Sequence, residues 1–273
     1  MSDARSGPVG IVVCGAAGRM GRLLIELAAS TPGVRVAGAI EHPAHAAVGQ
    51  DAGSVAGVPA LGLPIGADLG AVCRPEHVVV DFTVPAATLA HARIAAERGA
   101  GLVIGTTGLE PAQDRELREI AAGTRSVIAA NYSVGVTVLL DLVARATTLL
   151  GDAFDAEIVE MHHHHKKDAP SGTALALGRA VATARGRDFD AAKTLARAGN
   201  VGERPPGEIG IVALRAGDVV GDHTVVFGGL GERIELVHRA QSRACLARGA
   251  LRAAVWVAAK PRGVYAMRDV LGL

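Results

Sequence analysis

The chain has 273 residues, of which 49% are hydrophobic and 20% charged, a balance that is ordinary for a soluble globular enzyme with a large core. Its formal net charge of +1 leaves no electrostatic signature for nucleic acid or an anionic membrane, so neither is expected as a partner. Residues 1–8 lack the apolar core of a signal peptide, and no uninterrupted apolar run approaches the roughly 18 residues of a membrane span. We therefore expect a cytoplasmic protein.

Short apolar runs alternate with helical patterns through the first half of the chain. Pro85 and Pro111 suit the first turn of a helix, where a missing N–H costs nothing. This alternation predicts an α/β fold, a doubly wound parallel sheet of the Rossmann type over residues 1–133. The strands are expected at 9–14, 34–40, 78–82, 102–105 and 127–130, and the helices at 19–30, 85–98 and 111–122.

The second half follows a different pattern, and the composition changes most sharply near residues 131–135. Its later strands have no helices between them, which predicts a mixed or antiparallel sheet and hence a second, α+β domain over residues 134–242. Helices are expected at 136–150, 174–185 and 250–260, and strands at 154–161, 210–214, 219–227 and 234–238.

The three cysteines, Cys14, Cys73 and Cys245, are widely spaced and form no CxxC pair. Such an arrangement is typical of reduced cytosolic thiols that serve packing. A role as metal ligands or as a nucleophile is the less favoured alternative.

A glycine-rich segment follows the first predicted strand and opens the first predicted helix: Gly15-Ala16-Ala17-Gly18-Arg19-Met20-Gly21. Glycines permit a tight turn close to a pyrophosphate, and a helix N-terminus favours its negative charge. Glu41 lies 20 residues after Gly21, where a carboxylate can accept hydrogen bonds from the adenosine ribose. The spacing is GxxGxxG rather than GxGxxG, so a tight turn without a ligand remains an alternative for the glycine segment. For Glu41, the alternative is a solvated carboxylate at the end of a strand.

Two further loops follow predicted strands at the carboxyl edge of the same sheet, where such sheets bind ligands. The first is Gly105-Thr106-Thr107-Gly108, whose small residues and hydroxyls suit the ribose or nicotinamide of a cofactor. The second contains Asn131 and Tyr132 and is similarly placed.

The most informative stretch is the EMHHHHKKDAPSGT segment, from Glu160 to Thr173. Its histidines are internal and follow a predicted strand, which excludes an expression tag. Consecutive histidines cannot easily converge on one ion, and neither HExxH nor a cysteine partner is present, so no metal is expected. A solvated basic loop remains as another alternative.

The favoured interpretation of this segment is an anion-binding loop that carries out acid/base chemistry. Imidazoles titrate near neutral pH and can donate a proton to a substrate as hydride arrives. A nearby lysine attracts a carboxylate, and residues 170–173 begin a helix whose N–H groups and hydroxyls can bind a second one. The segment therefore fits a small dianion.

Five strings together resemble the 4-hydroxy-tetrahydrodipicolinate (dihydrodipicolinate) reductase family: GAAGRMG, GTTG, EMHHHHKKDAPSGTAL, LRAGDVVGDHTV and GERIELVHRAQSR. The resemblance runs from residue 9 to the C-terminal residues 269–273, and the histidine string is highly specific. It implies that a cyclic dicarboxylate is reduced to tetrahydrodipicolinate with NADH or NADPH, on the route to diaminopimelate and lysine. It also implies that the α+β domain forms a homotetramer and that residues 243–273 return to the Rossmann domain.

The resemblance implies roles for individual residues. His162 is similar to the family's proton donor/acceptor and Lys166 to its second catalytic proton donor. The substrate-binding positions are matched by His163, Gly172 and Thr173. The cofactor-binding positions are matched by Gly15, Ala16, Ala17, Gly18, Arg19, Met20, Glu41, His42, Gly105, Thr106, Thr107, Ala129, Ala130, Asn131 and Tyr132.

Two residues depart from the family pattern. His42 follows Glu41 where Arg is common, which leaves the choice between NADH and NADPH open. His164 also replaces a common Arg, but no catalytic role falls on it. The rival functions are another Rossmann dehydrogenase of amino-acid synthesis and a nucleotide sensor without turnover. A dehydrogenase of the aspartate-semialdehyde type would need a nucleophilic cysteine in its second domain. Only Cys245 lies there, and no motif around it supports that role.

Overall fold

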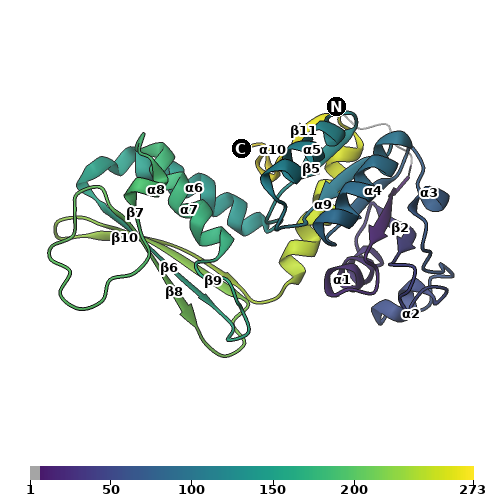
Figure 1. Ribbon diagram of the computed structural model, residues 1–273, viewed down its shortest axis with the longest axis horizontal. Helices are drawn as coiled ribbons and strands as arrows, with labels where there is room; N and C mark the ends of the chain where they lie inside the picture. The colour runs from purple at the N-terminus through teal and green to yellow at the C-terminus, as the bar shows by residue number, and fades with distance from the viewer. Residues whose placement is uncertain (1–6) are drawn as a thin grey trace. The chain divides into compact units, whose positions relative to one another are not determined.

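A computed structural model of the chain describes residues 7–273 (Figure 1). These residues divide into two compact units. One contains the chain up to Ser133 together with Ala244–Leu273, and the other contains Val134–Arg243. Each unit has its own sheet and its own hydrophobic core.

The sheet of the first unit is parallel throughout and has the strand order β11-β5-β4-β3-β1-β2. The order reverses between β1 and β3, so the carboxyl ends of these strands border the position where doubly wound sheets bind ligands. The strands are β1 (Val9–Cys14), β2 (Val34–Ile40), β3 (Val78–Asp81), β4 (Gly101–Ile104), β5 (Arg125–Ile128) and β11 (Gly263–Tyr265). The predicted Rossmann-type fold is thus confirmed.

The helices of this unit begin where the local sequence favours it. Helix α5 (Pro111–Ala122) has proline in its first turn and a capping box between Glu110 and Gln113. The first-unit core combines the buried faces of the sheet with α4 (Pro85–Glu97) and α5. The other helices are α1 (Arg19–Ala28), α2 (Ala52–Ala56), α3 (Leu69–Val72), α9 (Ala244–Ala258) and α10 (Met267–Leu271).

Helix α9 begins at Ala244, six residues before the expected start at Ala250. Arg248 and Gly249 interrupt the apolar pattern and conceal this first part of the helix. The structure explains the glycine, because a Cβ at Gly249 would lie 1.7 Å from the backbone oxygen of Tyr132. The short strands β11 and β7 (Lys193–Thr194) and the short helices α2, α3, α10 and α8 (Phe189–Ala192) were not predicted, because they are too short to show a periodic pattern.

The sheet of the second unit has the strand order β10-β9-β6-β8-β7. Strand β6 is parallel to β8 and antiparallel to β9, so the mixed sheet expected from the sequence is confirmed. The strands are β6 (Asp155–His162), β7 (Lys193–Thr194), β8 (Ile209–Arg215), β9 (Gly221–Gly228) and β10 (Arg233–Ala240). The helical segments are α6 (Val134–Leu150), η1 (Gly151–Ala153), α7 (Gly172–Ala184) and α8 (Phe189–Ala192).

Helices α6 and α7 pack on one face of this sheet (Figure 1). Of the residues that the structure describes, only the helical stretch 134–153 is long and apolar enough to cross a membrane by length and composition. Leu139 and Val143 on this stretch are buried in the second-unit core, and Arg145 pairs with Asp141 at 2.8 Å one turn apart. Helix α6 therefore packs one face into the second-unit core and leaves charged side chains on another.

Candidate functional site

The glycine turn after β1 has the geometry of a phosphate-binding turn. Gly15 has a φ of +68°, and its carbonyl oxygen accepts a hydrogen bond from Gly18 N–H at 3.0 Å. A Cβ at Gly21 would lie 2.1 Å from the Gly15 oxygen, so only glycine allows α1 to pack this closely against the turn. Helix α1 begins directly afterwards, at Arg19, with its N-terminus at the carboxyl edge of the sheet.

Glu41 follows β2 and is tied to this turn. One carboxylate oxygen accepts a hydrogen bond from Ala17 N–H at 2.9 Å, and the other accepts one from His42 N–H at 2.9 Å. Glu41 therefore orients the glycine turn as well as lying at the predicted ribose position. The side chains of Arg19 and His42 are exposed, and His42 Nδ1 accepts a hydrogen bond from Ala44 N–H at 3.3 Å.

The loop after β4 packs against the side chains of Phe82 and the buried Thr88. A Cβ at Gly105 would come within 2.0 Å of the Phe82 ring, which accounts for this glycine. Thr106 is 7% exposed, and its hydroxyl lies 2.7 Å from that of Thr88, whereas Thr107 is exposed. The first hydroxyl of the GTTG segment thus faces the protein and the second faces outward.

The predicted cofactor residues in the loop after β5 differ in their exposure to solvent. Ala130 is exposed, and Ala129 and Asn131 are partly exposed. Tyr132, in contrast, is 1% exposed, and its hydroxyl lies 2.9 Å from the carbonyl oxygens of Ile104 and Val127. Burial raises the pKa of Tyr132. The Tyr132 side chain is therefore part of the core, where its ring lies 5.4 Å from that of Phe82.

In the second unit, the buried carboxylate of Glu160 organises the histidine segment. Its Oε2 lies 2.5 Å from His162 Nδ1, and its Oε1 accepts a hydrogen bond from Ser171 N–H at 3.0 Å. Both oxygens accept hydrogen bonds from the Arg215 guanidinium at 3.0 Å. Glu160 is 0% exposed, so its charge is shielded from water.

Two opposing influences act on the pKa of Glu160. Burial is the largest and pushes the pKa upward, but the hydrogen bonds from Arg215, His162 and Ser171 outweigh it. The pKa of Glu160 therefore lies below its ordinary value, and the group is an ionised carboxylate that only accepts hydrogen bonds.

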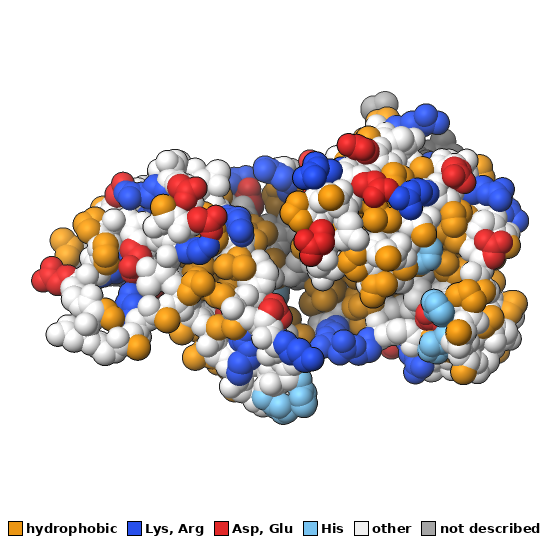
Figure 2. All heavy atoms as spheres, in the orientation of Figure 1, with side chains coloured by type: hydrophobic (Ala, Val, Ile, Leu, Met, Phe, Trp, Pro, Cys, Tyr) orange, Lys and Arg blue, Asp and Glu red, His pale blue; other side chains and the backbone are white. Residues whose placement is uncertain are grey.

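The residues after His162 form a loop that is folded against residues 215–219. Ala216 N–H donates to the His162 carbonyl at 2.9 Å, and His163 N–H donates to Val219 at 2.7 Å. Lys166 Nζ lies 2.9 and 3.0 Å from the two oxygens of Asp168. The hydrogen bond from Lys166 lowers the pKa of Asp168. A group of histidine side chains with basic side chains beside it is visible on the surface of this unit (Figure 2).

The imidazoles of this loop point in different directions. His162 contacts Glu160, His163 Nε2 lies 3.5 Å from an Arg243 nitrogen, and His164 Nδ1 lies 2.8 Å from the Gly217 oxygen. Desolvation and the charge of Arg243 lower the pKa of His163. Among residues 7–273, the one cluster with ligand-type atoms in metal-binding proximity is Cys14, Asp81 and His91, which lies in the other unit.

Helix α7 begins at Gly172, directly after the loop. Ser171 is its N-cap, and the hydroxyl oxygen accepts a hydrogen bond from Ala174 N–H at 3.2 Å. The same hydroxyl lies 3.1 Å from Nε2 of the buried His223, whose pKa burial lowers to about 4. Gly172 and Thr173 thus form the first turn of the helix, where its dipole favours a bound carboxylate.

Sequence reasoning assigned no role to Glu160, Arg215, Asp168 or Arg243, although the quoted strings contain all four. Glu160 lies two residues before His162 on β6, so the two side chains share one face of the strand. That spacing was a usable signal. The contribution of Arg215 could not be seen, because it depends on the pairing of β8 with β6, in which Arg215 lies opposite His162.

Two family models match the chain, one described as dihydrodipicolinate reductase, N-terminus (residues 9–132), and one as dihydrodipicolinate reductase, C-terminus (residues 135–271). The chain belongs to the dihydrodipicolinate reductase family. It is therefore an oxidoreductase of the nicotinamide-dependent Rossmann type, as the resemblance predicted.

Curated relatives agree over nearly the full length. The 4-hydroxy-tetrahydrodipicolinate reductase of Anaeromyxobacter sp. (strain Fw109-5) is 52% identical and that of Halorhodospira halophila 51% identical. The matched region covers 97% of this chain in both cases, and 98% and 99% of the respective relatives.

Solved structures support the same fold. A dipicolinate-bound dihydrodipicolinate reductase from Paenisporosarcina sp. TG-14 matches with a TM-score of 0.73 at 20% identity, over 95% of this chain and 97% of that one. An aspartate semialdehyde dehydrogenase from Vibrio cholerae matches with a TM-score of 0.51 at 12% identity, over 92% and 97% of the two chains. The fold alone therefore does not separate this chain from the rival class of dehydrogenases. The two family models do, because both match dihydrodipicolinate reductase.

Proposed function

We propose that this chain reduces 4-hydroxy-tetrahydrodipicolinate to tetrahydrodipicolinate in the cytoplasm, on the route to diaminopimelate and lysine. The observation that carries the proposal is the buried Glu160, which holds His162, Arg215 and the N-terminus of α7 in one arrangement. Family membership and the relatives' printed activity supply the reaction.

The substrate is a small dianion, and the second unit offers two kinds of anion-binding group. The first is the N-terminal turn of α7, with Gly172 and Thr173, to which one carboxylate binds. The second is the pair of His163 and Arg243, which lie 3.5 Å apart and meet the other carboxylate. This unit is therefore the substrate domain.

His162 exchanges the proton at Nε2. Because Glu160 is an ionised acceptor, the Nδ1 atom facing it at 2.5 Å carries a proton and Nε2 remains available to the substrate. Nε2 lies near Gly221, where a Cβ would come within 3.0 Å of it, so a side chain at this position would crowd the exchanging atom. Lys166, which Asp168 holds at 2.9 Å, acts as the second proton donor.

The cofactor, NADH or NADPH, supplies the hydride when bound. We place its pyrophosphate at the turn from Gly15 to Met20 and its adenosine ribose at Glu41. The loops 105–107 and 129–132 at the same sheet edge serve the nicotinamide half. Tyr132 contributes through its backbone, because its side chain is buried.

A homotetramer is proposed to form through the second unit. One face of its sheet is covered by α6 and α7, whereas the other carries partly exposed apolar side chains, with Val212, Leu214 and Val237 each 40–43% exposed. The apolar side chains on this open face are Val159, Met161, Val212, Leu214, Val226 and Val237. An apolar sheet face of this kind is typical of a subunit interface, and the molecular mass from light scattering tests it.

The reaction itself is the first expected result. Purified protein should consume NADH or NADPH only when freshly prepared product of the preceding synthase is present, as followed by absorbance. Pyridine-2,6-dicarboxylate, a planar compound with both carboxylates, should inhibit competitively with that substrate. No turnover with fresh substrate and either cofactor would contradict the assignment, and tight cofactor binding without turnover would favour a nucleotide sensor.

Cofactor choice should depend on pH through His42. Glu41 favours the ribose hydroxyl of NADH and repels the 2′-phosphate of NADPH, and an imidazole offsets that repulsion only when protonated towards acidic pH. The ratio of kcat/KM for NADPH to that for NADH should therefore rise from about pH 8.5 to about pH 6. His42 Nδ1 accepts a hydrogen bond from Ala44 N–H, so the neutral ring carries its hydrogen on Nε2, and an additional proton must go to Nδ1 and displace Ala44 N–H.

Two variants separate this effect from that of exposed Arg19 nearby. His42→Ala should give a lower, flatter ratio across the pH range, and His42→Arg a higher one at every pH. Identical, pH-independent ratios in all three proteins would show that His42 does not face the ribose.

A further inference from the structure

We propose that Asp81 is a positioning residue for the cofactor, which holds the loop after β4 in its binding conformation through Thr88 and Thr106. Asp81 is the last residue of β3 and is 1% exposed. It lies opposite Cys14 at the end of β1 and opposite Ile104 at the end of β4. This is the position where the strand order reverses, directly beneath the proposed cofactor site.

This buried carboxylate accepts hydrogen bonds from several donors, most of them at Oδ1. Oδ1 accepts hydrogen bonds from Thr83 N–H at 2.8 Å and from the Thr83 hydroxyl at 2.6 Å. It also accepts one from the Thr88 hydroxyl at 3.1 Å, and Oδ2 pairs with His91 Nδ1 at 2.7 Å. Burial, the largest influence, raises the pKa of Asp81, but the hydrogen bonds from His91 and Thr83 outweigh it and leave the pKa below its ordinary value. Asp81 is thus ionised and only accepts.

This charge gives the hydroxyl chain one direction. The Thr88 and Thr106 hydroxyls both lie within hydrogen-bond distance of Asp81 Oδ1, at 3.1 and 3.4 Å, and Thr88 donates over the shorter distance. The Thr88 oxygen then accepts a hydrogen bond from Thr106, whose hydroxyl is 2.7 Å away. The chain Thr106→Thr88→Asp81 fastens the GTTG segment to β3 and α4, and Gly105 N–H adds a bond to the Asp81 carbonyl at 2.8 Å.

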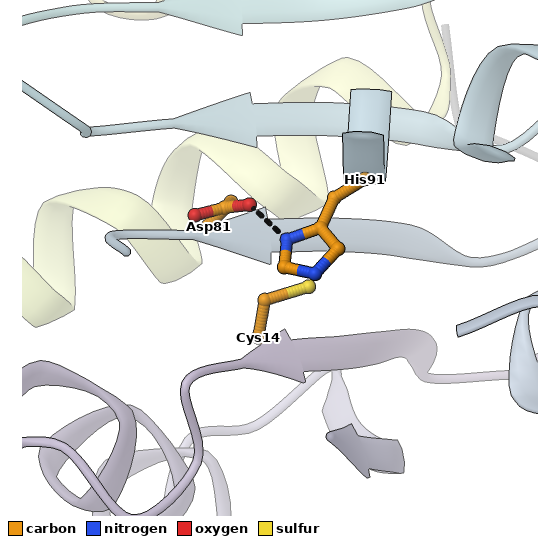
Figure 3. A group of neighbouring side chains, drawn as sticks. All are labelled: Cys14, Asp81 and His91. Carbon is orange, nitrogen blue, oxygen red and sulfur yellow. Dashed lines mark hydrogen bonds and ion pairs between the residues drawn. The ribbon is translucent and has the colours of Figure 1, made fainter. Parts of the chain in front are cut away.

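The neighbouring side chains fit a hydrogen-bonded network better than a metal site. Figure 3 shows the His91 ring between Asp81 and Cys14, and the three residues have ligand-type atoms within 4.8 Å of one another. A cation would have to displace the donors on Asp81. Burial and the negative charge of Asp81 raise the pKa of the Cys14 thiol, which keeps it protonated and a poor ligand.

The proposal rests on the proposed cofactor site and predicts a defect in cofactor binding. Thr88→Val keeps the shape of this fully buried side chain but removes the hydroxyl, so it should raise the dissociation constant of NADH about tenfold. Thr88→Ser retains the hydroxyl and should stay within about threefold of wild type. At saturating NADH, kcat should change by less than about threefold, because the proton-exchanging groups lie elsewhere.

A matched control separates positioning from general loss of stability. Thr147 is 1% exposed, and its hydroxyl donates to the Val143 carbonyl within α6 of the other unit. Thr147→Val therefore removes a buried hydroxyl and should lower the melting temperature without changing NADH affinity.

Direct binding of NADH is measured by calorimetry or fluorescence for wild type and these variants, with Asp81→Asn expected to bind more weakly than Thr88→Val. Wild-type affinity in Thr88→Val, or an equal affinity loss in Thr147→Val, would overturn the role of Asp81. Failure of the wild type itself to bind NADH would instead overturn the proposed cofactor site.

Discussion

His162→Ala and Lys166→Ala should each lower kcat steeply, by about 10²-fold or more, as expected for the loss of a general acid/base. His162 is held by Glu160 at 2.5 Å and Lys166 by Asp168 at 2.9 Å, so each is oriented before substrate arrives. Nucleotide affinity should remain nearly unchanged, because the proposed cofactor site belongs to the other unit. Steady-state kinetics and NADH binding on the same preparations measure both quantities.

Two neighbouring residues provide matched controls. The side chains of His164 and Lys167 are exposed in the same loop, and neither carries a proposed role. His164→Ala and Lys167→Ala should therefore stay within about threefold of wild-type kcat. Equal losses in all four variants would identify the loop as structural, and wild-type activity in His162→Ala and Lys166→Ala would leave only a solvated basic loop.

Glu160→Gln should produce the second largest loss, with kcat reduced by about 10²-fold, because the variant no longer fixes the tautomer of His162. A carboxamide offers one acceptor oxygen where Glu160 offers two. Arg215 and Ser171 both donate to Oε1, so the amide nitrogen is left facing His162 Nδ1. Nδ1 then accepts, the proton moves to Nε2, and the exchanging atom can no longer act as a base.

Two measurements distinguish this mechanism from simple destabilisation. Nitrogen NMR should report the change of the His162 tautomer in Glu160→Gln. Glu157→Gln serves as the control, because Glu157 lies on the same strand and pairs with Arg197 at 2.8 Å and Arg204 at 2.9 Å, on the opposite face. A kcat loss in Glu157→Gln equal to that in Glu160→Gln, with the His162 tautomer unchanged, would contradict the positioning role.

The contribution of the ionised Glu160 carboxylate to the folding stability of the protein should depend on pH. The pKa of Glu160 is lower in the folded chain than its ordinary value, so its contribution is fully present above the ordinary glutamate pKa of about 4.3. As the pH falls through the lower folded pKa, that contribution disappears. The difference in melting temperature between wild type and Glu160→Gln should therefore be constant near neutrality and shrink under strongly acidic conditions.

The sequence by itself determined the features that depend on local pattern. The strands at 9–14 and 34–40 follow from their apolar runs, and the glycine turn from the requirement for a positive φ at Gly15 and close helix packing at Gly21. The histidine string and the glycine turn resemble the dihydrodipicolinate reductase family, and the family models over residues 9–132 and 135–271 match that family.

Only the tertiary structure decided which distant residues support those features. Arg215 reaches Glu160 because the parallel pairing of β6 with β8 sets it opposite His162, 53 residues away along the chain. Asp81, Thr88 and Thr106 come from three elements of the first unit, and their bonds form only after the sheet has brought those elements together. The direction of side chains in loops could not be predicted from the sequence either. Tyr132 and Thr106 belong to loops in the sequence pattern, but the structure buries both side chains. Long-range hydrogen bonds and burial depend on strand register, which a local sequence pattern does not contain.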